Sequence, residues 1–216
     1  DSSTSRGLGD VYKRQAYGHI AIPIACIKNG KGPTLLAMSG NHGDEYEGQI
    51  ATTKLIRDLD PKDIKGRVIV LPAANFPAAM AGMRTSPIDQ GNLNRTFPGD
   101  PNGTPTWMIS HFIETELVSR ADVILDLHSG GSSLLYIPSA LVAISKDKKR
   151  TEKLIALAEA FGAPVGYVNA GGGDRTSTGA AERAGKLRLG TELGGAGMVG
   201  IDAKKFAEDG VRRVME

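Results

Sequence analysis

Short apolar runs alternate with helical patterns along most of this chain, and this alternation constrains its fold more than any other feature. Three runs are apolar almost without interruption, at residues 34–38, 67–72 and 123–127. Such strands are typical of parallel sheets that are buried on both faces. The helical patterns between them supply the crossover connections that parallel strands need. We therefore predict an α/β fold with a mixed, mostly parallel sheet and helices on both faces.

Other patterns refine this architecture. Pro23 interrupts the strand pattern of residues 20–27 and favours an edge position. Thr151 and Asp202 are expected to cap helices. Turn residues are spread from residue 73 to about residue 105, which predicts a long irregular segment of the kind that is usually functional. The remaining expected elements are helices at residues 47–59, 107–119, 151–161 and 202–214 and strands at residues 165–168 and 187–193.

Composition excludes several classes of protein. The chain has 216 residues, 40% of them hydrophobic, so it can bury roughly 70% of its unfolded surface in one sizeable core. Its 26 Lys and Arg against 24 Asp and Glu give a net charge of +2, too balanced for a nucleic-acid partner. The longest nearly apolar stretch, residues 134–144, is too short for a membrane span. The single cysteine, Cys26, fits a reducing cytoplasm.

The first fifteen residues differ from the rest. Residues 1–15 are polar, lack helical or strand periodicity and resemble translated adapter sequence, so we expect a non-native leader. Residues 16–216 are expected to form one domain, whose last helical pattern stops without a cap.

Three polar clusters follow apolar strands, where ligands bind in open α/β sheets. They are Asn41-His42-Gly43-Asp44-Glu45, Asp126-Leu127-His128-Ser129-Gly130 and Gly190-Thr191-Glu192-Leu193-Gly194-Gly195. His42 and Glu45 are three residues apart, a spacing that lets both reach one cation. His128 would supply a third ligand. Two histidines and one glutamate, with a fourth position for water, form the ligand set of a hydrolytic zinc site. The alternative is that these are ordinary hydrogen-bonded residues at strand ends.

Glu192 and the long loop add further candidates. Glu192 is the candidate general base, since a carboxylate near an activated water can take its proton and pass it to a leaving amine. Alternatively, it caps a turn or pairs with Arg188 or Arg183. Arg84 and Arg95 suit capture of a carboxylate or an oxyanion, or they are solvated surface residues. Leu93, Phe97 and Pro98 predict that the loop around Arg95 packs inward.

Four motifs in order, SGNHGDEYEG, NLNRTFPGD, DLHSGG and GTELGG, resemble the succinylglutamate desuccinylase/aspartoacylase family, a branch of the zinc carboxypeptidase-like fold. The resemblance covers roughly residues 17–216. It implies one Zn²⁺ bound by His42, Glu45 and His128, with Glu192 as general base. It also implies that Arg84 stabilises the oxyanion. Asn94, Arg95 and, through a looser match, Arg183 would bind the substrate carboxylate.

Within the family, the segments NGKGPT, RTSPIDQGNLNRTFPG and TELGGAG are most similar to those of the N-acetyl-diaminobutyrate deacetylases of ectoine degradation. The implied activity is hydrolysis of the amide of a small N-acyl amino acid. Desuccinylase, aspartoacylase and metallocarboxypeptidase activities are the alternatives, and an inactive metal-binding piece is the non-enzyme alternative. Family members continue into a C-terminal β-rich domain, before which this chain would be truncated. The oligomeric state stays open, a homo-oligomer included.

A dinucleotide-binding protein is the competing class. Residues 195–200 match G-x-G-x-x-G between a strand and a helix. That fingerprint normally opens the first βα unit and is followed by an acidic residue about 20 positions later. Here the match follows a late strand, and only 16 residues remain after Gly200, which disfavours nicotinamide binding.

Overall fold

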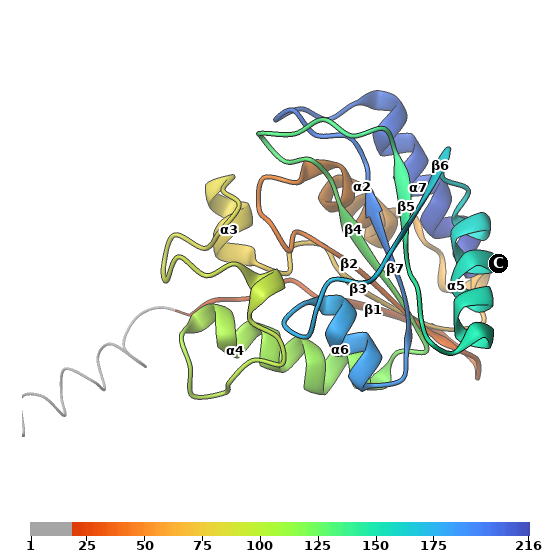
Figure 1. Ribbon diagram of the computed structural model, residues 1–216, viewed down its shortest axis with the longest axis horizontal. Helices are drawn as coiled ribbons and strands as arrows, with labels where there is room; N and C mark the ends of the chain where they lie inside the picture. The colour runs from red at the N-terminus through yellow and green to blue at the C-terminus, as the bar shows by residue number, and fades with distance from the viewer. Residues whose placement is uncertain (1–18) are drawn as a thin grey trace, which may run out of the picture.

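The computed structural model describes residues 19–216, so the leader expected at residues 1–15 lies outside the described residues. Within them, seven strands form one sheet in the order β1-β3-β2-β4-β7-β5-β6 (Figure 1). The strands are β1 (Ala25–Asn29), β2 (Thr34–Ser39), β3 (Gly66–Leu71), β4 (Val123–His128), β5 (Ser139–Ala143), β6 (Val165–Asn169) and β7 (Leu187–Glu192).

The centre of the sheet is parallel and its flanks are antiparallel. Strands β3, β2, β4 and β7 run parallel to one another. Strand β1 joins β3 in the antiparallel sense, and β5 joins β7 likewise, with β6 parallel to β5 at the far edge. The prediction of a mixed, mostly parallel sheet is confirmed. Strand β1 lies at an edge, as Pro23 indicated, but it begins at Ala25, because the proline limits pairing in the segment before it.

Helices cover both faces of this sheet (Figure 1). Helices α2 (Tyr46–Asp58), α5 (Lys148–Phe161) and α7 (Ile201–Met215) pack on one face, where Leu55, Phe161 and Val211 enter the same apolar core. Helices α4 (Pro105–Phe112) and α6 (Ser177–Arg183) lie on the other face, where Ile109 and Ala180 share a second core. The sheet is therefore buried from both sides, which explains the uninterrupted apolar runs of its central strands.

Several elements depart from the expectations. The segment expected to be irregular contains helix α3 (Phe76–Ala81) and a 3-10 turn, Leu93–Arg95. Strand β5 and helix α6 were not expected. Helix α5 begins earlier than expected, because Asp147 rather than Thr151 accepts a hydrogen bond from the backbone of Lys149. Helix α7 is preceded by Gly200, so Asp202 lies inside its first turn and does not cap it.

The helix expected at residues 107–119 changes its winding along its length. Helix α4 is followed by a π-helical turn, Ile113–Leu117, and a 3-10 turn, Val118–Arg120. Upstream of it, Leu93 and Phe97 are completely buried, so this part of the long loop packs inward at these two residues, whereas Arg95 and Pro98 are exposed.

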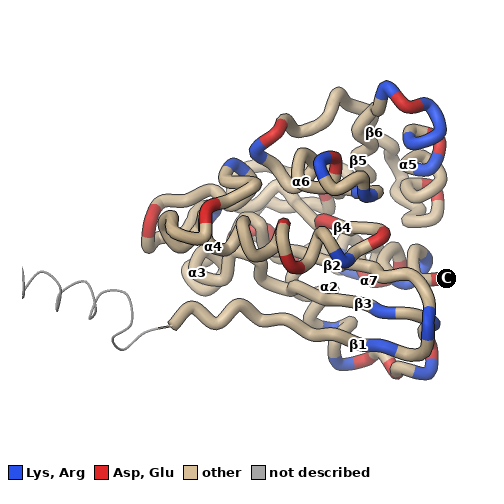
Figure 2. Tube along the Cα trace, turned by 90° about the horizontal axis from the view of Figure 1, so that it is seen from below, with Lys and Arg blue, Asp and Glu red and all other residues tan. Residues whose placement is uncertain are grey.

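Charged positions of both signs are distributed over the helices and turns, and the strands are uncharged over most of their length (Figure 2). Among the described residues, none of the helices combines the length and the apolar character needed to cross a membrane.

Candidate active site

The β2–α2 loop holds two of the predicted metal ligands in a tight conformation. It runs from Gly40, which has a φ of +69°, to Glu45, which directly precedes α2. Gly43 lies against helix α3, so close that a Cβ there would lie 2.0 Å from the backbone of Ala78. Only a glycine fits at this approach, and the loop can therefore place His42 and Glu45 on the same side.

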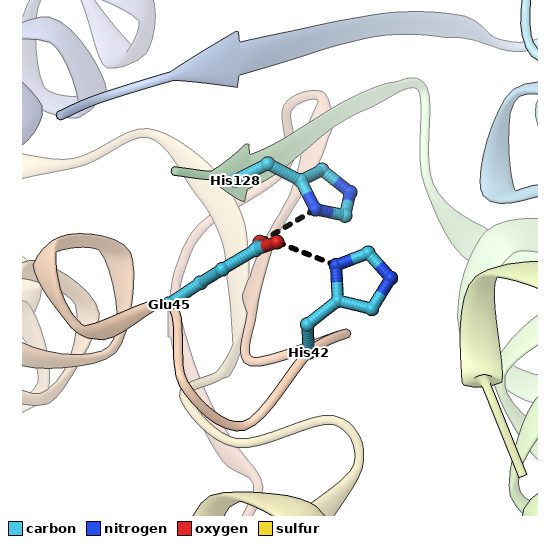
Figure 3. Close-up of side chains that lie close together, drawn as sticks. All are labelled: His42, Glu45 and His128. Atoms are coloured by element: carbon cyan, nitrogen blue, oxygen red, sulfur yellow. Dashed lines mark hydrogen bonds and ion pairs between the residues drawn. The ribbon is translucent and has the colours of Figure 1, made fainter. Parts of the chain in front are cut away.

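The sheet brings the third residue to the same place. His128 is the last residue of β4, which lies beside β2 in the parallel sense. The carboxylate of Glu45 lies between the two imidazoles (Figure 3). Its Oε1 is 2.5 Å from Nδ1 of His42, and its Oε2 is 2.8 Å from Nδ1 of His128. The ring centroids of the two histidines are 5.2 Å apart, so the predicted convergence is present in the structure.

These three side chains are buried, with 2–6% of their surface exposed. Burial alone would raise the pKa of Glu45, but the charges and hydrogen bonds of His128 and His42 outweigh it and lower the pKa to about 2. Burial would lower the pKa of His128, yet Asp126 and Glu45 raise it to about 10. The cluster thus combines an ionised Glu45 carboxylate with a His128 imidazole that holds its proton strongly.

The donor set suits a metal ion. His42, Glu45 and His128 each offer one ligand atom, and these atoms lie within 4.8 Å of one another. Among residues 19–216, this is the only group of three or more His, Cys, Asp or Glu side chains with such geometry. Two nitrogens and one carboxylate oxygen form the three-ligand set of open, catalytic metal sites, rather than a closed structural site rich in cysteine.

Glu192 ends strand β7 directly opposite His128 in the register of the two strands. Burial raises its pKa to about 7, Glu45 acts in the same direction, and His128 and Arg84 oppose it. Its buried Oε2 has no hydrogen-bond partner. The alternative pairings are absent: Arg188 donates to Asp126 at 2.6 Å, and Arg183 donates to Glu114 at 2.8 Å. A carboxyl group poised near neutrality can both accept and return a proton.

A cavity of about 390 Å³ opens above the cluster. Arg84, Asn94, Arg95 and Glu192 line it, together with the three candidate ligands. Arg84 is half-exposed and its Nη1 lies 3.3 Å from Oε1 of Glu45. Aliphatic and glycine residues also line the cavity, namely Gly130, Leu134, Leu141, Ala143, Gly171 and Gly172. This volume is at the lower end for small-molecule sites.

Arg183 is the predicted site residue that the structure does not bring to this cavity. It ends helix α6, where its guanidinium makes two hydrogen bonds to Glu114 and one to the backbone of Asp174. Those contacts hold it in a neighbouring depression beside Trp107. The structure therefore does not place Arg183 with the other predicted substrate residues, because its hydrogen bonds direct the side chain toward the π-helical turn that contains Glu114.

Four polar residues that sequence reasoning did not assign to the site support it from behind. Nε2 of His42 donates to Oδ1 of Asn92 at 3.2 Å, and Nε2 of His128 donates to Oδ2 of Asp126 at 3.0 Å. Ser177 and Arg188 also donate to Asp126. Ligating histidines usually give their second N–H to an oxygen, so the Asp in DLH was a usable signal.

The glycine-rich turn at residues 195–200 has another role. The amide of Gly195 donates to Glu47 at 2.8 Å, that of Ala196 to Leu134, and that of Gly197 to Gly131. These amides hold the turn against helix α2 and the loop after β4. They are therefore not free to cradle a phosphate, which argues against the dinucleotide alternative.

The fold and the site define a carboxypeptidase-like α/β protein with a cluster of two histidines and one glutamate at the ends of its central strands. The catalytic domain of the succinylglutamate desuccinylase/aspartoacylase family matches residues 31–216. The chain belongs to this family, and the resemblance drawn from its four motifs is confirmed.

The chain is similar to several individual members of this family. The chain is 44% identical over 197 residues to an N-alpha-acetyl-L-2,4-diaminobutyric acid deacetylase of Halomonas elongata, covering 91% of this chain and 58% of the relative. A succinylglutamate desuccinylase/aspartoacylase structure from Rhodobacter sphaeroides is 44% identical, with a TM-score of 0.86 over 90% of this chain and 58% of that one. The product-bound ectoine utilization protein EutE of Ruegeria pomeroyi is 42% identical, with a TM-score of 0.89 over 92% of this chain and 61% of that one. The chain thus spans about three fifths of the length of these relatives.

Proposed function

We propose that this chain is the catalytic part of a zinc-dependent amidohydrolase that removes the acyl group from a small N-acyl amino acid. The observation that carries the proposal is the convergence of His42, Glu45 and His128 within 4.8 Å, beside the partly protonated Glu192. Zn²⁺ held by these residues supplies Lewis-acid chemistry, polarising a carbonyl and acidifying a water molecule. A cytoplasmic location is part of the proposal, supported by the single cysteine, Cys26.

The other residues of the cavity take complementary roles. Glu192 accepts a proton from the attacking water and returns it to the leaving amine, which a pKa of about 7 allows in both directions. The half-exposed guanidinium of Arg84 donates to the oxyanion that develops on the acyl carbonyl. Asn94 and Arg95, at the cavity wall, bind the carboxylate of the amino acid.

The substrate class follows from the size of the cavity and from the relatives. About 390 Å³ accommodates an acylated amino acid. The Halomonas elongata relative is named as a deacetylase of N-alpha-acetyl-L-2,4-diaminobutyric acid. We therefore propose an N-acetyl-diaminobutyrate-type substrate.

Metal content tests the first half of the proposal. The purified chain should hold about one zinc per molecule by elemental analysis, because two imidazoles and a carboxylate bind zinc strongly. The double variant His42→Ala, His128→Ala should lose it. Metal retained stoichiometrically by that variant would place the ion elsewhere and contradict the proposed ligand set.

Hydrolysis tests the second half. Acetate release from N-acetyl-2,4-diaminobutyrate is measured for the chain and for a fusion to the part of the Halomonas elongata relative outside the match, with N-succinylglutamate and N-acetylaspartate as competing substrates. Glu192→Gln should keep zinc and lower kcat by about 10²–10⁴-fold, since it removes the proton acceptor. Unchanged kcat in this variant would refute the role of Glu192.

A further inference from the structure

A continuous network of hydrogen bonds joins Nε2 of His42 to Nε2 of His128. Both nitrogens face away from Glu45. This hydrogen-bond network passes behind the cavity. It includes residues 92–94, which begin the segment that we propose to bind the substrate carboxylate. Its members come from four different parts of the fold: the β2–α2 loop, the 3-10 turn after α3, the end of β4 and the start of α6. We name residues 92–95 the substrate loop.

Asp126 is the centre of the hydrogen-bond network on the β4 side. It is completely buried. Its Oδ2 accepts hydrogen bonds from His128 Nε2 at 3.0 Å, Ser177 Oγ at 2.5 Å and Arg188 Nη2 at 2.6 Å. Its Oδ1 accepts from Asn41 Nδ2 at 2.9 Å. One carboxylate therefore contacts a candidate metal ligand, a helix N-terminus and a compensating guanidinium at once.

Ser177 connects Asp126 to the substrate loop. Its hydroxyl donates to Asp126, while its backbone N–H donates to Oδ1 of Asn94 at 2.9 Å. The backbone N–H of Asn94 donates to Oδ1 of Asn92 at 3.1 Å, and the same oxygen accepts from Nε2 of His42 at 3.2 Å. The hydrogen-bond network therefore runs from His128 to His42 through the substrate loop. Ser177, which links its two halves, is only 2% exposed.

The hydrogen-bond network also holds a proton on the nitrogen of each histidine ring that faces away from Glu45. Ionised carboxylate and amide oxygens only accept hydrogen bonds, so the nitrogens that face Asp126 and Asn92 are protonated. Nδ1 of each ring faces the carboxylate of Glu45, so it is the nitrogen that would bind a cation beside Glu45 once its own proton has left. An oxygen that accepts a hydrogen bond from the far nitrogen of a ligating histidine orients the ring and makes it a better ligand.

We propose that Asp126 and Ser177 are positioning residues that couple cation binding by His128 to the order of the substrate loop. This inference rests on the proposed function. Asp126 and Ser177 are buried, and Asp126 Oδ2 and Asn92 Oδ1 each accept more than one hydrogen bond. A ring that is held by a cation therefore also holds Asp126, Ser177 and Asn94. By linkage, an ordered substrate loop favours the cation to the same extent.

Hydrogen exchange with Zn²⁺ tests the coupling without any need for turnover. In the wild-type protein, saturating Zn²⁺ should slow amide exchange in residues 92–97 and 174–180, compared with the same protein in a chelator. We expect a slowing of at least about 5-fold, which is the lower end of typical coupling between two sites. Ser177→Ala removes the hydroxyl link but no metal ligand, so it should bind Zn²⁺ while the slowing falls below about 2-fold. Asp126→Asn should weaken Zn²⁺ binding about 10–100-fold, measured against a chromophoric chelator.

Ser39→Ala is the matched control. Ser39 is buried like Ser177, and its hydroxyl forms hydrogen bonds with Thr52 and Pro72, which are not part of the network. This variant should keep both the zinc affinity and the slowed exchange. Wild-type slowing that persists in Ser177→Ala would overturn the inference while leaving the zinc site intact. A wild-type chain that binds no Zn²⁺ would overturn the proposed function as well. Because Ser177→Ala keeps the buried charge pair, the test stands even where Asp126→Asn does not fold.

Discussion

Glu192 illustrates how one side chain acquires a property from its surroundings. The residue ends strand β7 and lies opposite His128, where burial favours the neutral acid. Sequence reasoning selected Glu192 from its place in GTELGG, but the shift of its pKa depends on burial that only the assembled sheet provides. The same holds for Glu45, whose low pKa comes from two histidines, one of them 83 residues away.

The pKa of Glu192 predicts a pH-dependent stability difference. Its folded pKa of about 7 is above the usual glutamate pKa of 4.5, so the folded state keeps a proton that the unfolded state loses. Wild-type stability should therefore fall as pH rises from 4.5 to 7, relative to Glu192→Gln, by up to about 3 kcal/mol. Urea unfolding at a series of pH values, with chelator present, measures this difference.

A control variant separates this effect from general changes of charge. Glu152 is exposed on helix α5, so Glu152→Gln should show no such divergence from the wild type between pH 4.5 and 7. Parallel stability curves for wild type and Glu192→Gln would mean that the carboxyl group titrates normally and is not buried as described.

At the scale of single residues, sequence reasoning identified the groups that perform chemistry better than those that hold them. His42, Glu45, His128 and Glu192 stand in glycine-rich motifs at strand ends, and the structure brings them together. Asn92 opens the motif NLNRTFPGD but lies 50 residues from His42, and Ser177 lies in a segment that none of the four motifs covers. Their contacts depend on how the long loop and α6 pack, which a local pattern does not encode. Arg183 was misplaced for the same reason.

At the scale of elements, the strands were easier to predict than the connections. The parallel strands β2, β3 and β4 read as apolar runs because both of their faces are buried. Helix α3 has only six residues, begins with Phe76-Pro77 and shows too few turns for a helical period. Strand β5 alternates half-buried and buried residues close to Pro138. Short elements of this kind are stabilised by their tertiary contacts, so their local sequences carry little signal.

The packing of helix α3 on the β2–α2 loop predicts a sensitive position. A Cβ at Gly43 would lie 2.0–2.3 Å from the backbone of Ala78 and Ala79. Backbone atoms cannot move aside as a flexible side chain can, so Gly43→Ala should displace α3 or the loop. We expect a loss of about 1–3 kcal/mol of unfolding free energy and weaker zinc binding, because His42 and Glu45 move with the loop.

Gly166→Ala serves as the comparison for this variant. A Cβ at Gly166 in strand β6 would meet no atom within 4 Å, so the substitution should leave stability and zinc binding unchanged. Urea unfolding and chelator competition are measured for both variants. Equal stabilities for Gly43→Ala and wild type would show that the close approach of α3 is not maintained in solution.

At the scale of the whole molecule, the site joins parts of the chain that are distant in sequence. Glu45 precedes α2, which packs on one face of the sheet, and His128 ends the central strand β4. Asp126 extends the connection to α6 on the opposite face through Ser177. A ligand held here therefore bridges both helical layers, so its binding free energy should contribute to the stability of the entire fold and not only to that of one loop.

Zinc binding is accordingly expected to raise the Tm of the whole chain. At a free Zn²⁺ concentration about 100 times the Kd, the stabilisation is about 2.7 kcal/mol. For a chain of this size that corresponds to a rise of roughly 5–10 °C. The transition should shift as one step by both near- and far-ultraviolet circular dichroism, since the bridged layers unfold together. Mg²⁺, which prefers six oxygen ligands, should give no comparable rise, and the His42→Ala, His128→Ala variant should not respond to Zn²⁺. A shift confined to one spectroscopic probe would mean that the metal stabilises only its own loop.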